Sequence, residues 1–328
     1  MDYPTLSELN SASSILKRAW DYFYSNFTSF TKFSVIVYLP LLILTSFQII
    51  IYLLKVENIF SSIILDFFST ILSLATVIIS LAVEPTIYAV LIIVFIQIIK
   101  KEKIDFQSIK TIFSKKSNNF IKSVVVFFLF FITVQQISQL ILLVPLSFST
   151  LRQSIDIETF FFSESVTEKI NSIDLQQIVA NLYPNIYFLT EFISMVVAAI
   201  FTKKYYFYIP ITIVENVTQL IPLNNSKLLV KEVNNIATKL FFLGLFIPYL
   251  VNLINTLIFT KILGLQGTLG EIFLNISAIR QISLFISALI NIFIYPTLTI
   301  AALLLYLKAR QSLGETNEDI FSKYKQDL

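Results

Sequence analysis

Histidine and cysteine are both absent from the 328-residue sequence. Their absence excludes thiol catalysis, disulfides, c-type haem attachment, zinc sites built from imidazole or thiolate groups, and Ser–His–Asp triads. Only five glycines occur, and the G-x-x-G-x-x-G spacing of Gly264, Gly267 and Gly270 is neither a P-loop nor a dinucleotide-binding fingerprint. The sequence therefore predicts no cofactor, no metal site and no catalytic residue.

Charged residues are also scarce. They make up 14% of the chain against 56% hydrophobic residues, and the mean hydropathy is +0.78. A soluble domain carries about 25% charged and about 45–50% apolar residues. This chain lacks the polar side chains to cover its core in water, so we expect a polytopic membrane protein. The formal net charge of +3 is too small to indicate a nucleic-acid partner.

Six stretches are long and apolar enough to cross a hydrocarbon core about 30 Å thick, which takes about 20 residues per helix. The sequence predicts an all-α transmembrane bundle that forms a single membrane domain over residues 1–328. We expect the spans at 33–54, 67–99, 121–146, 186–214, 240–262 and 282–307. The second is longer than one straight span requires, so we expect tilt, a kink at Pro85 or a helical extension into the cytoplasm.

The basic residues are distributed unevenly between the connecting segments. Nineteen of the 24 Lys and Arg residues fall on one side of the expected spans, and five fall on the other. Cytoplasmic loops carry the excess of Lys and Arg. We therefore expect a protein of the cell membrane with both termini in the cytoplasm, an external acidic loop at 147–185 and a cytoplasmic tail at 308–328.

The segments that precede the first, third and fifth spans resemble one another. Each runs from a leading Ser to a trailing Asn, at 14–26, 108–119 and 226–235, with apolar positions at helical spacing and Lys or Arg opposite. This pattern is typical of helices that lie in the inner membrane interface. Each returning span carries a proline: Pro85, Pro210 or Pro296. The pattern predicts three hairpin units, at about 12–104, 105–216 and 222–312, each with a cytoplasmic interfacial amphipathic helix.

Two stretches resemble a known superfamily. The first contains Pro210, Glu215-Asn216 and the segment from Ser226 to Lys231. The second contains Pro296-Thr297 and ends at Lys308-Ala309-Arg310. These stretches are similar to six-span bacterial membrane proteins that include the membrane domain of some glycerophosphoryl diester phosphodiesterases. The resemblance implies a six-span fold. It does not imply the enzymatic activity, which in that superfamily belongs to a separate domain that depends on histidines.

Ionisable residues inside the expected spans are candidate functional groups, because each costs at least about 2.5–3.5 kcal/mol near the bilayer centre. Glu84 lies 17 residues into its apolar stretch and precedes Pro85. One hypothesis is that Glu84 binds a cation or a proton, and that the backbone carbonyl freed by Pro85 provides a second oxygen. The other is that Glu84 is a structural group, either paired with a cation or neutral. Lys203 and Lys204 either extend to the inner interface or face inward.

An inward-facing basic pocket would combine Lys203 and Lys204 with Lys227, Lys231 and Lys239, the three candidate contacts for lipid headgroups. Uncharged polar residues also occur inside the spans: Gln135, Gln136, Gln139, Asn252, Asn255 and Asn291. They serve either as interhelical hydrogen-bonding groups or as the lining of a polar conduit.

Three functions are compatible with these features. The leading hypothesis is a non-enzymatic membrane protein that organises the membrane or binds lipid or a partner at its cytoplasmic face. Its partners would be anionic headgroups of the bilayer, a protein partner or a second copy of the chain. The alternative is a small transporter or channel that uses Glu84 and the Gln and Asn faces. A membrane-embedded enzyme with Glu84 or Glu215 as acid or base is the third hypothesis, and no paired-carboxylate spacing supports it.

Overall fold

The computed structural model describes residues 8–56, 62–154, 190, 192–217, 220–262 and 277–325. Within these ranges the chain forms helices and turns and no strand, which confirms the expected all-α class. The external loop expected at 147–185 lies mostly outside the described residues. Its first part, 147–154, continues the helix that precedes it.

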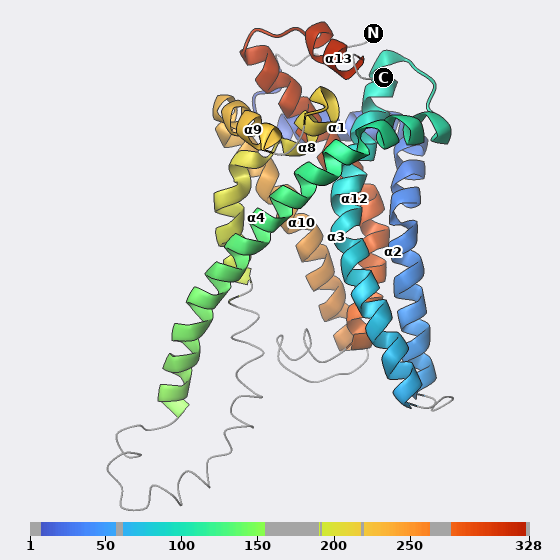
Figure 1. Cartoon of the computed structure of the whole chain (residues 1–328), viewed down its shortest axis with the longest axis vertical. Coiled ribbons are helices and arrows are strands. Elements are labelled where there is room, and N and C mark those ends of the chain that lie inside the picture. The colour runs from blue at the N-terminus through green and yellow to red at the C-terminus, as the bar shows by residue number, and fades with distance from the viewer. Residues whose placement is uncertain are drawn as a thin grey trace, which may run out of the picture. The chain divides into compact units, whose positions relative to one another are not determined.

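The helices follow one another along the chain as Figure 1 labels them. They are α1 Ala12–Ser25, α2 Phe27–Val56, α3 Ser62–Lys100, α4 Phe106–Ser154, the 3₁₀ helix η1 Lys203–Tyr205, α8 Tyr208–Glu215, α9 Ile221–Glu232, α10 Asn234–Ile262, α12 Ser277–Ser312 and α13 Asn317–Lys325.

Six stretches of helix in the described chain are long and apolar enough to cross a membrane, which confirms the expected number. They are Phe27–Ile51, Phe67–Lys100, Phe106–Leu142, Phe192–Glu215, Asn234–Ile258 and Gln281–Ser312. Prolines lie inside several of the long helices, among them Pro40, Pro85, Pro248 and Pro296. Proline is tolerated inside membrane-spanning helices, because neighbouring groups satisfy the freed backbone carbonyls.

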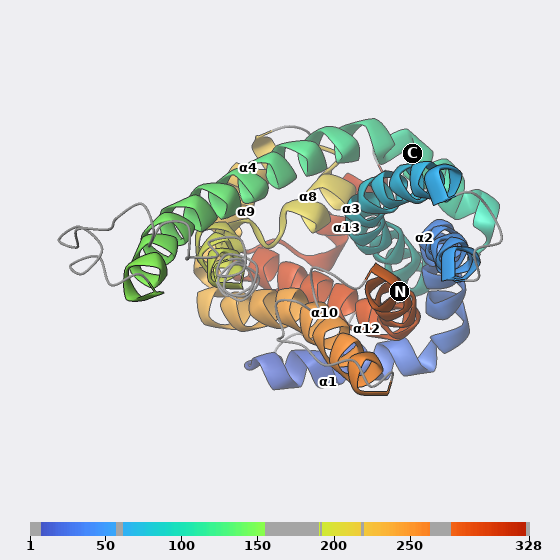
Figure 2. The same cartoon turned by 90° about the horizontal axis from the view of Figure 1, so that it is seen from below.

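The chain divides into two compact units. The first contains Met1–Leu129, Thr202–Asn255 and Gln281–Leu328, and the second contains Phe130–Phe201 and Thr256–Arg280. The expectation of one domain over 1–328 stays a prediction. In the first unit α2 and α3 lie side by side, as both views show (Figures 1 and 2). The short helices α1, α8, α9 and α13 gather at one end of these long helices (Figure 1).

The end of the first unit where the short helices gather contains most of its buried apolar core. The second half of α3 is buried on nearly every side, from Ile87 to Ile96, and so is α12 from Ile300 to Leu307. A helix that is apolar all round is buried among other elements. The first half of α3 differs, because large apolar side chains such as Phe67, Leu74 and Ile78 are exposed there. Such a surface is stable in lipid and not in water.

The three leading serines of the expected repeat have three different structural roles. Ser14 completes a capping box with Ser11 at the start of α1. Ser108 lies in the first turn of α4, where its N–H donates to Asp105 Oδ1 at 2.7 Å and its hydroxyl accepts from Gln97 Nε2 at 2.7 Å. The segment that contains Ser108 is continuous with α4, so the second expected interfacial helix is not a separate element.

The third leading serine, Ser226, forms hydrogen bonds with backbone groups that a break in the fourth span leaves without helical partners. Helical residues 192–202 give way to η1, and α8 starts at Tyr208 after a turn. Ser226 reaches this break from α9. Its hydroxyl accepts the Phe207 N–H at 2.9 Å and donates to the Lys204 carbonyl at 3.3 Å. The expected span 186–214 is therefore interrupted in its described part, and Pro210 lies in the first turn of α8, where proline costs little.

We expect Ser226→Ala to lower the free energy of unfolding by about 1–3 kcal/mol, the cost of leaving a buried donor without an acceptor. The donor is the backbone N–H of Phe207, whose side chain is fully buried. Thermal denaturation of the purified chain in detergent micelles measures the change. Ser114→Ala, at an exposed position of α4, is the control and should denature like the wild type. Equal midpoints for both variants would contradict the role of Ser226.

Candidate functional site

Tyrosine side chains surround the intramembrane carboxylate of Glu84. The Tyr295 hydroxyl, from α12, faces this carboxylate as a hydrogen-bond donor, and Tyr38 from α2 lies within electrostatic reach. Tyr88 lies one turn after Glu84 on α3, on the same helix face, and its ring packs edge-on against Tyr295 with centroids 5.4 Å apart. Part of the Glu84 side chain is exposed at the surface of α3, whereas its carboxyl group is desolvated by burial beside the phenols.

A glycine makes room for this cluster. A Cβ atom built on Gly244 of α10 would lie 3.5 Å from the Tyr88 hydroxyl. Four helices, α2, α3, α10 and α12, therefore meet around one carboxylate and three phenol groups. Hydroxyl and carboxylate oxygens together can exchange a proton or coordinate a small cation.

Lys203 and Lys204 do not join this cluster. Both are half-buried in η1, at the break in the fourth span, and the Lys204 ammonium lies over the Tyr205 ring, 5.1 Å from its centroid. Within the described residues no ion pair joins either lysine to Glu84. The four residues proposed from the sequence as one intramembrane site thus lie in two places, with Glu84 and Pro85 on α3.

The three lysines proposed as headgroup contacts lie on one continuous stretch of α9 and α10. Lys227 and Lys231 are one turn apart on the exposed face of α9, and Lys239 is exposed near the start of α10. None forms an ion pair with another described residue. Large apolar side chains are exposed beside them: Leu220, Ile221 and Leu228. An exposed surface of this mixed kind is typical of helices that lie on a membrane.

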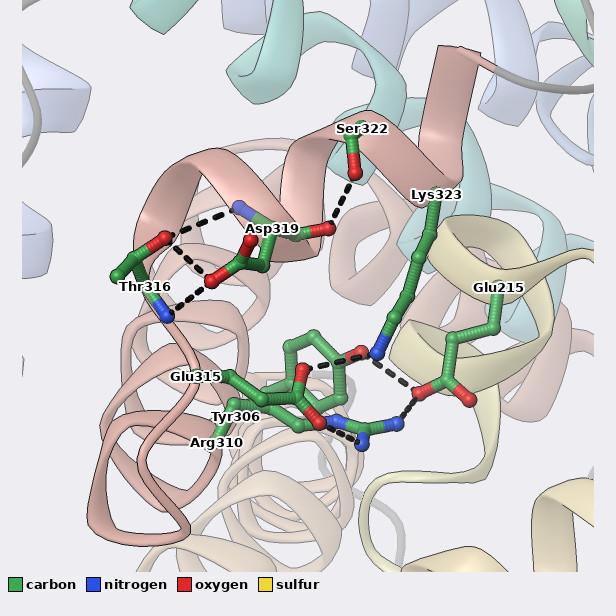
Figure 3. Close-up of polar contacts among 8 residues, drawn as sticks. All are labelled: Glu215, Tyr306, Arg310, Glu315, Thr316, Asp319, Ser322 and Lys323. Atoms are coloured by element: carbon green, nitrogen blue, oxygen red, sulfur yellow. Dashed lines mark hydrogen bonds and ion pairs between the residues drawn. The ribbon is translucent and has the colours of Figure 1, made fainter.

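A buried ion-pair network, which sequence reasoning missed, lies at the end of α8 (Figure 3). Glu215 accepts a hydrogen bond from the Tyr306 hydroxyl at 2.8 Å and pairs with Arg310. The side chains of Glu215 and Arg310 are only 10% and 11% exposed. Arg310 also pairs with Glu315 at 2.8 Å, and Lys323 reaches Glu315 from α13 at 2.9 Å. Opposite charges alternate along the network, so each carboxylate contacts a cation.

Helix α13 begins beside this network with a capping box (Figure 3). The Asp319 N–H donates to Thr316 Oγ1 at 3.2 Å, while the backbone N–H and hydroxyl of Thr316 donate to Asp319 Oδ2 at 2.9 and 2.6 Å. These bonds from Thr316 lower the pKa of the Asp319 carboxyl. The cap fixes where α13 starts, and thus where Lys323 meets Glu315.

Residue Asn216, directly after Glu215, turns the chain out of α8. It adopts the left-handed conformation, with φ of 50° and ψ of 34°, which asparagine tolerates better than most residues. Asn119 of α4 donates from Nδ2 to both the carbonyl and the Oδ1 of Asn216, each at 3.1 Å. The trailing Asn119 of the expected second repeat thus holds the end of the fourth span.

The asparagines of the fifth span make the expected interhelical hydrogen bonds. Asn255 donates to the Ser287 hydroxyl of α12 at 3.1 Å, and Asn252 Oδ1 accepts from Ser283 at 2.9 Å. These contacts confirm one of the two interpretations of Asn252 and Asn255. In comparisons with protein-family models, curated proteins and solved structures, no match was found.

We expect Glu215→Gln to lower the free energy of unfolding by about 3–5 kcal/mol, because it leaves Arg310 buried and incompletely paired. The double variant Glu215→Gln and Arg310→Gln should lose about 0.5–3 kcal/mol less free energy of unfolding than the sum of the two single-variant losses. Denaturation in detergent measures all three variants. The exposed Glu232→Gln is the control and should leave the midpoint unchanged. Strictly additive losses would show that Glu215 and Arg310 do not stabilise each other.

Proposed function

We propose that this integral membrane protein is non-enzymatic and binds anionic lipid headgroups at the cytoplasmic face of the cell membrane. The contacts are Lys227, Lys231 and Lys239, and both termini lie in the cytoplasm. The observation that carries the proposal is the surface of α9, where exposed lysines without an ion-pair partner among the described residues lie on the same helix as exposed apolar side chains.

The packing of α9 supports this proposal. Its opposite face is fixed to the protein through buried Leu223, Leu229 and Val230, and through the Ser226 hydrogen bonds. The helix therefore presents Lys227 and Lys231 on a rigid support. Lysines held in this way lose less conformational freedom on binding than lysines in a flexible loop. A phosphate group can meet both ammonium groups, since they are one turn apart.

The size of the effect follows from membrane electrostatics. Each basic residue near an anionic surface contributes about 1 kcal/mol, which is about fivefold in affinity. Three lysines together contribute about 100-fold. The interaction is between exposed charges, so it weakens as ionic strength rises and the Debye length shortens. The dependence on the number of lysines and the dependence on ionic strength distinguish headgroup binding from burial of apolar surface.

We expect the triple variant Lys227→Gln, Lys231→Gln and Lys239→Gln to bind fluorescent phosphatidylglycerol about 100-fold more weakly than the wild type. Fluorescence anisotropy of the detergent-solubilised chain, at low and high salt, measures the dissociation constant. A reporter fused after Lys239 should report the cytoplasm.

The matched control is the triple variant Lys32→Gln, Lys103→Gln and Lys110→Gln, which removes the same charge from exposed positions elsewhere. It should retain most of the affinity, and neither variant should alter binding of phosphatidylcholine. An equal loss in both triple variants would show that net charge alone governs binding and would reject the α9 surface.

Proton or cation transport is a second candidate function, favoured by the arrangement around Glu84. A carboxylate inside a span, with the Tyr295 hydroxyl as a donor and Tyr38 and Tyr88 nearby, is the arrangement expected of an intramembrane relay. A purely structural carboxyl would instead be paired with a cation or remain protonated and neutral. Within the described residues no such cation pairs with Glu84.

Under this second function, Glu84→Gln abolishes flux through vesicles reconstituted with the chain, because the amide cannot carry a proton. A pH-sensitive dye inside the vesicles reports proton uptake when a membrane potential is imposed. Tyr295→Phe should slow the flux, and the exposed Glu232→Gln should leave it unchanged. Wild-type flux no greater than that of protein-free vesicles would reject transport of protons.

A further inference from the structure

An apolar groove lies where the first short helix meets two long helices of the first unit. Figure 2 shows α1, α10 and α12 near one another. The groove has a volume of about 500 Å³, within the range of ligand pockets. Its walls are formed by Leu16 and Trp20 from α1, Ile247 from α10, and Leu289, Ile290, Phe293, Ile294, Thr297 and Leu298 from α12.

The lining of this groove is apolar and open. Trp20 is 53% exposed and Phe293 is 45% exposed, although both contribute to its walls. Among the described residues that line the groove, Thr297 alone has a hydroxyl group, and that hydroxyl is buried within the protein. A ligand in the groove would therefore meet hydrocarbon and aromatic surface, which favours an aliphatic chain over a polar molecule.

The length of the groove fits one leaflet of a bilayer. Along α12 it extends from Leu289 to Leu298, nine helical rises of about 1.5 Å, or about 14 Å. Half of a hydrocarbon core about 30 Å thick is about 15 Å. An acyl chain that enters beside α1 and follows α12 would thus traverse the depth of its own leaflet.

A cation lies at the α1 side of the groove. Lys17 is exposed, is three residues from Trp20 on the same face of α1, and forms no ion pair with another described residue. A cation beside an apolar groove is complementary to a molecule with an anionic head and an aliphatic tail. We infer that the groove binds one acyl chain of an anionic phospholipid of the inner leaflet, with its phosphate at Lys17. This inference rests on the proposed lipid binding but concerns a separate surface from α9.

The single tryptophan of the chain, Trp20, lies in this groove and reports on its occupant. The full chain is reconstituted into nanodiscs of phosphatidylcholine, and phosphatidylglycerol brominated on its acyl chains is added in increasing proportion. We expect quenching of the Trp20 fluorescence to saturate at a low mole fraction of the brominated lipid, as it does for a site. Brominated phosphatidylcholine should quench only in proportion to its mole fraction.

Two variants, each with a matched control, test the groove without adding a second tryptophan. Ile290→Phe fills the groove and should abolish the saturable component, whereas Ile78→Phe, at an exposed position of α3 outside the groove, should retain it. Lys17→Gln should weaken the saturable component about fivefold, and Lys110→Gln should not. Unchanged thermal denaturation verifies that each variant is folded.

Quenching that follows the bulk mole fraction in the wild type, or that Ile290→Phe leaves intact, would overturn the inference. Failure of the headgroup proposal has a different signature. In that case the triple variant of Lys227, Lys231 and Lys239 would lose no more affinity for phosphatidylglycerol than its control variant, while Trp20 quenching would still saturate and still depend on Ile290.

Discussion

The pairing of Glu215 with Arg310 is the contact on which the end of the first unit with the short helices α8, α9 and α13 depends. A carboxylate and a guanidinium that are each about 90% buried stabilise the fold only when both are present. The pair fixes the end of α8 against α12, and Arg310 then holds Glu315, which receives Lys323 from α13. Upstream of α8 the fourth span is broken at Lys203–Tyr205, and Ser226 of α9 hydrogen-bonds to the backbone at that break. The exposed lysines of α9 therefore lie on a helix that is bonded to the segment leading into this ion pair.

The first unit contains two regions that differ in what covers their apolar side chains. At the end where the short helices gather, α3 and α12 are buried among other helices of the protein. In the first half of α3 the apolar side chains are exposed, and lipid replaces the missing neighbours. There the association of helices relies on specific contacts, because lipid tails are as apolar as leucine. The hydrogen bonds of Asn252 and Asn255 with the serines of α12 are contacts of this kind.

The sequence predicted the class and the number of spans because both depend on composition and on the length of apolar runs. It also identified Glu215, Asn216 and Arg310 as residues of a recurring pattern. It did not predict that Glu215 and Arg310 form a pair, because 95 residues separate them and helical periodicity carries no information about such contacts. The same limit applies to Tyr38 and Tyr295, which come to Glu84 from other helices. Only Tyr88 has a local signal, its position one turn after Glu84. The break in the fourth span was missed because a single hydroxyl, that of Ser226, stabilises it.

Headgroup attraction and acyl-chain binding complement each other physically. Exposed lysines attract any anionic lipid, act over about a Debye length and weaken with salt. An apolar groove selects by shape, acts only on contact and is insensitive to salt. A single anionic phospholipid with its phosphate at Lys17 and one acyl chain in the groove would combine charge attraction with apolar contact. Its bound chain would cover Trp20 and Phe293, which the fold leaves exposed. The lysines of α9 would then concentrate anionic lipid at the inner face, and the groove of α1, α10 and α12 would retain one molecule of it. Under the two proposals, charge would account for recruitment of the lipid, and the shape of the groove would account for selectivity.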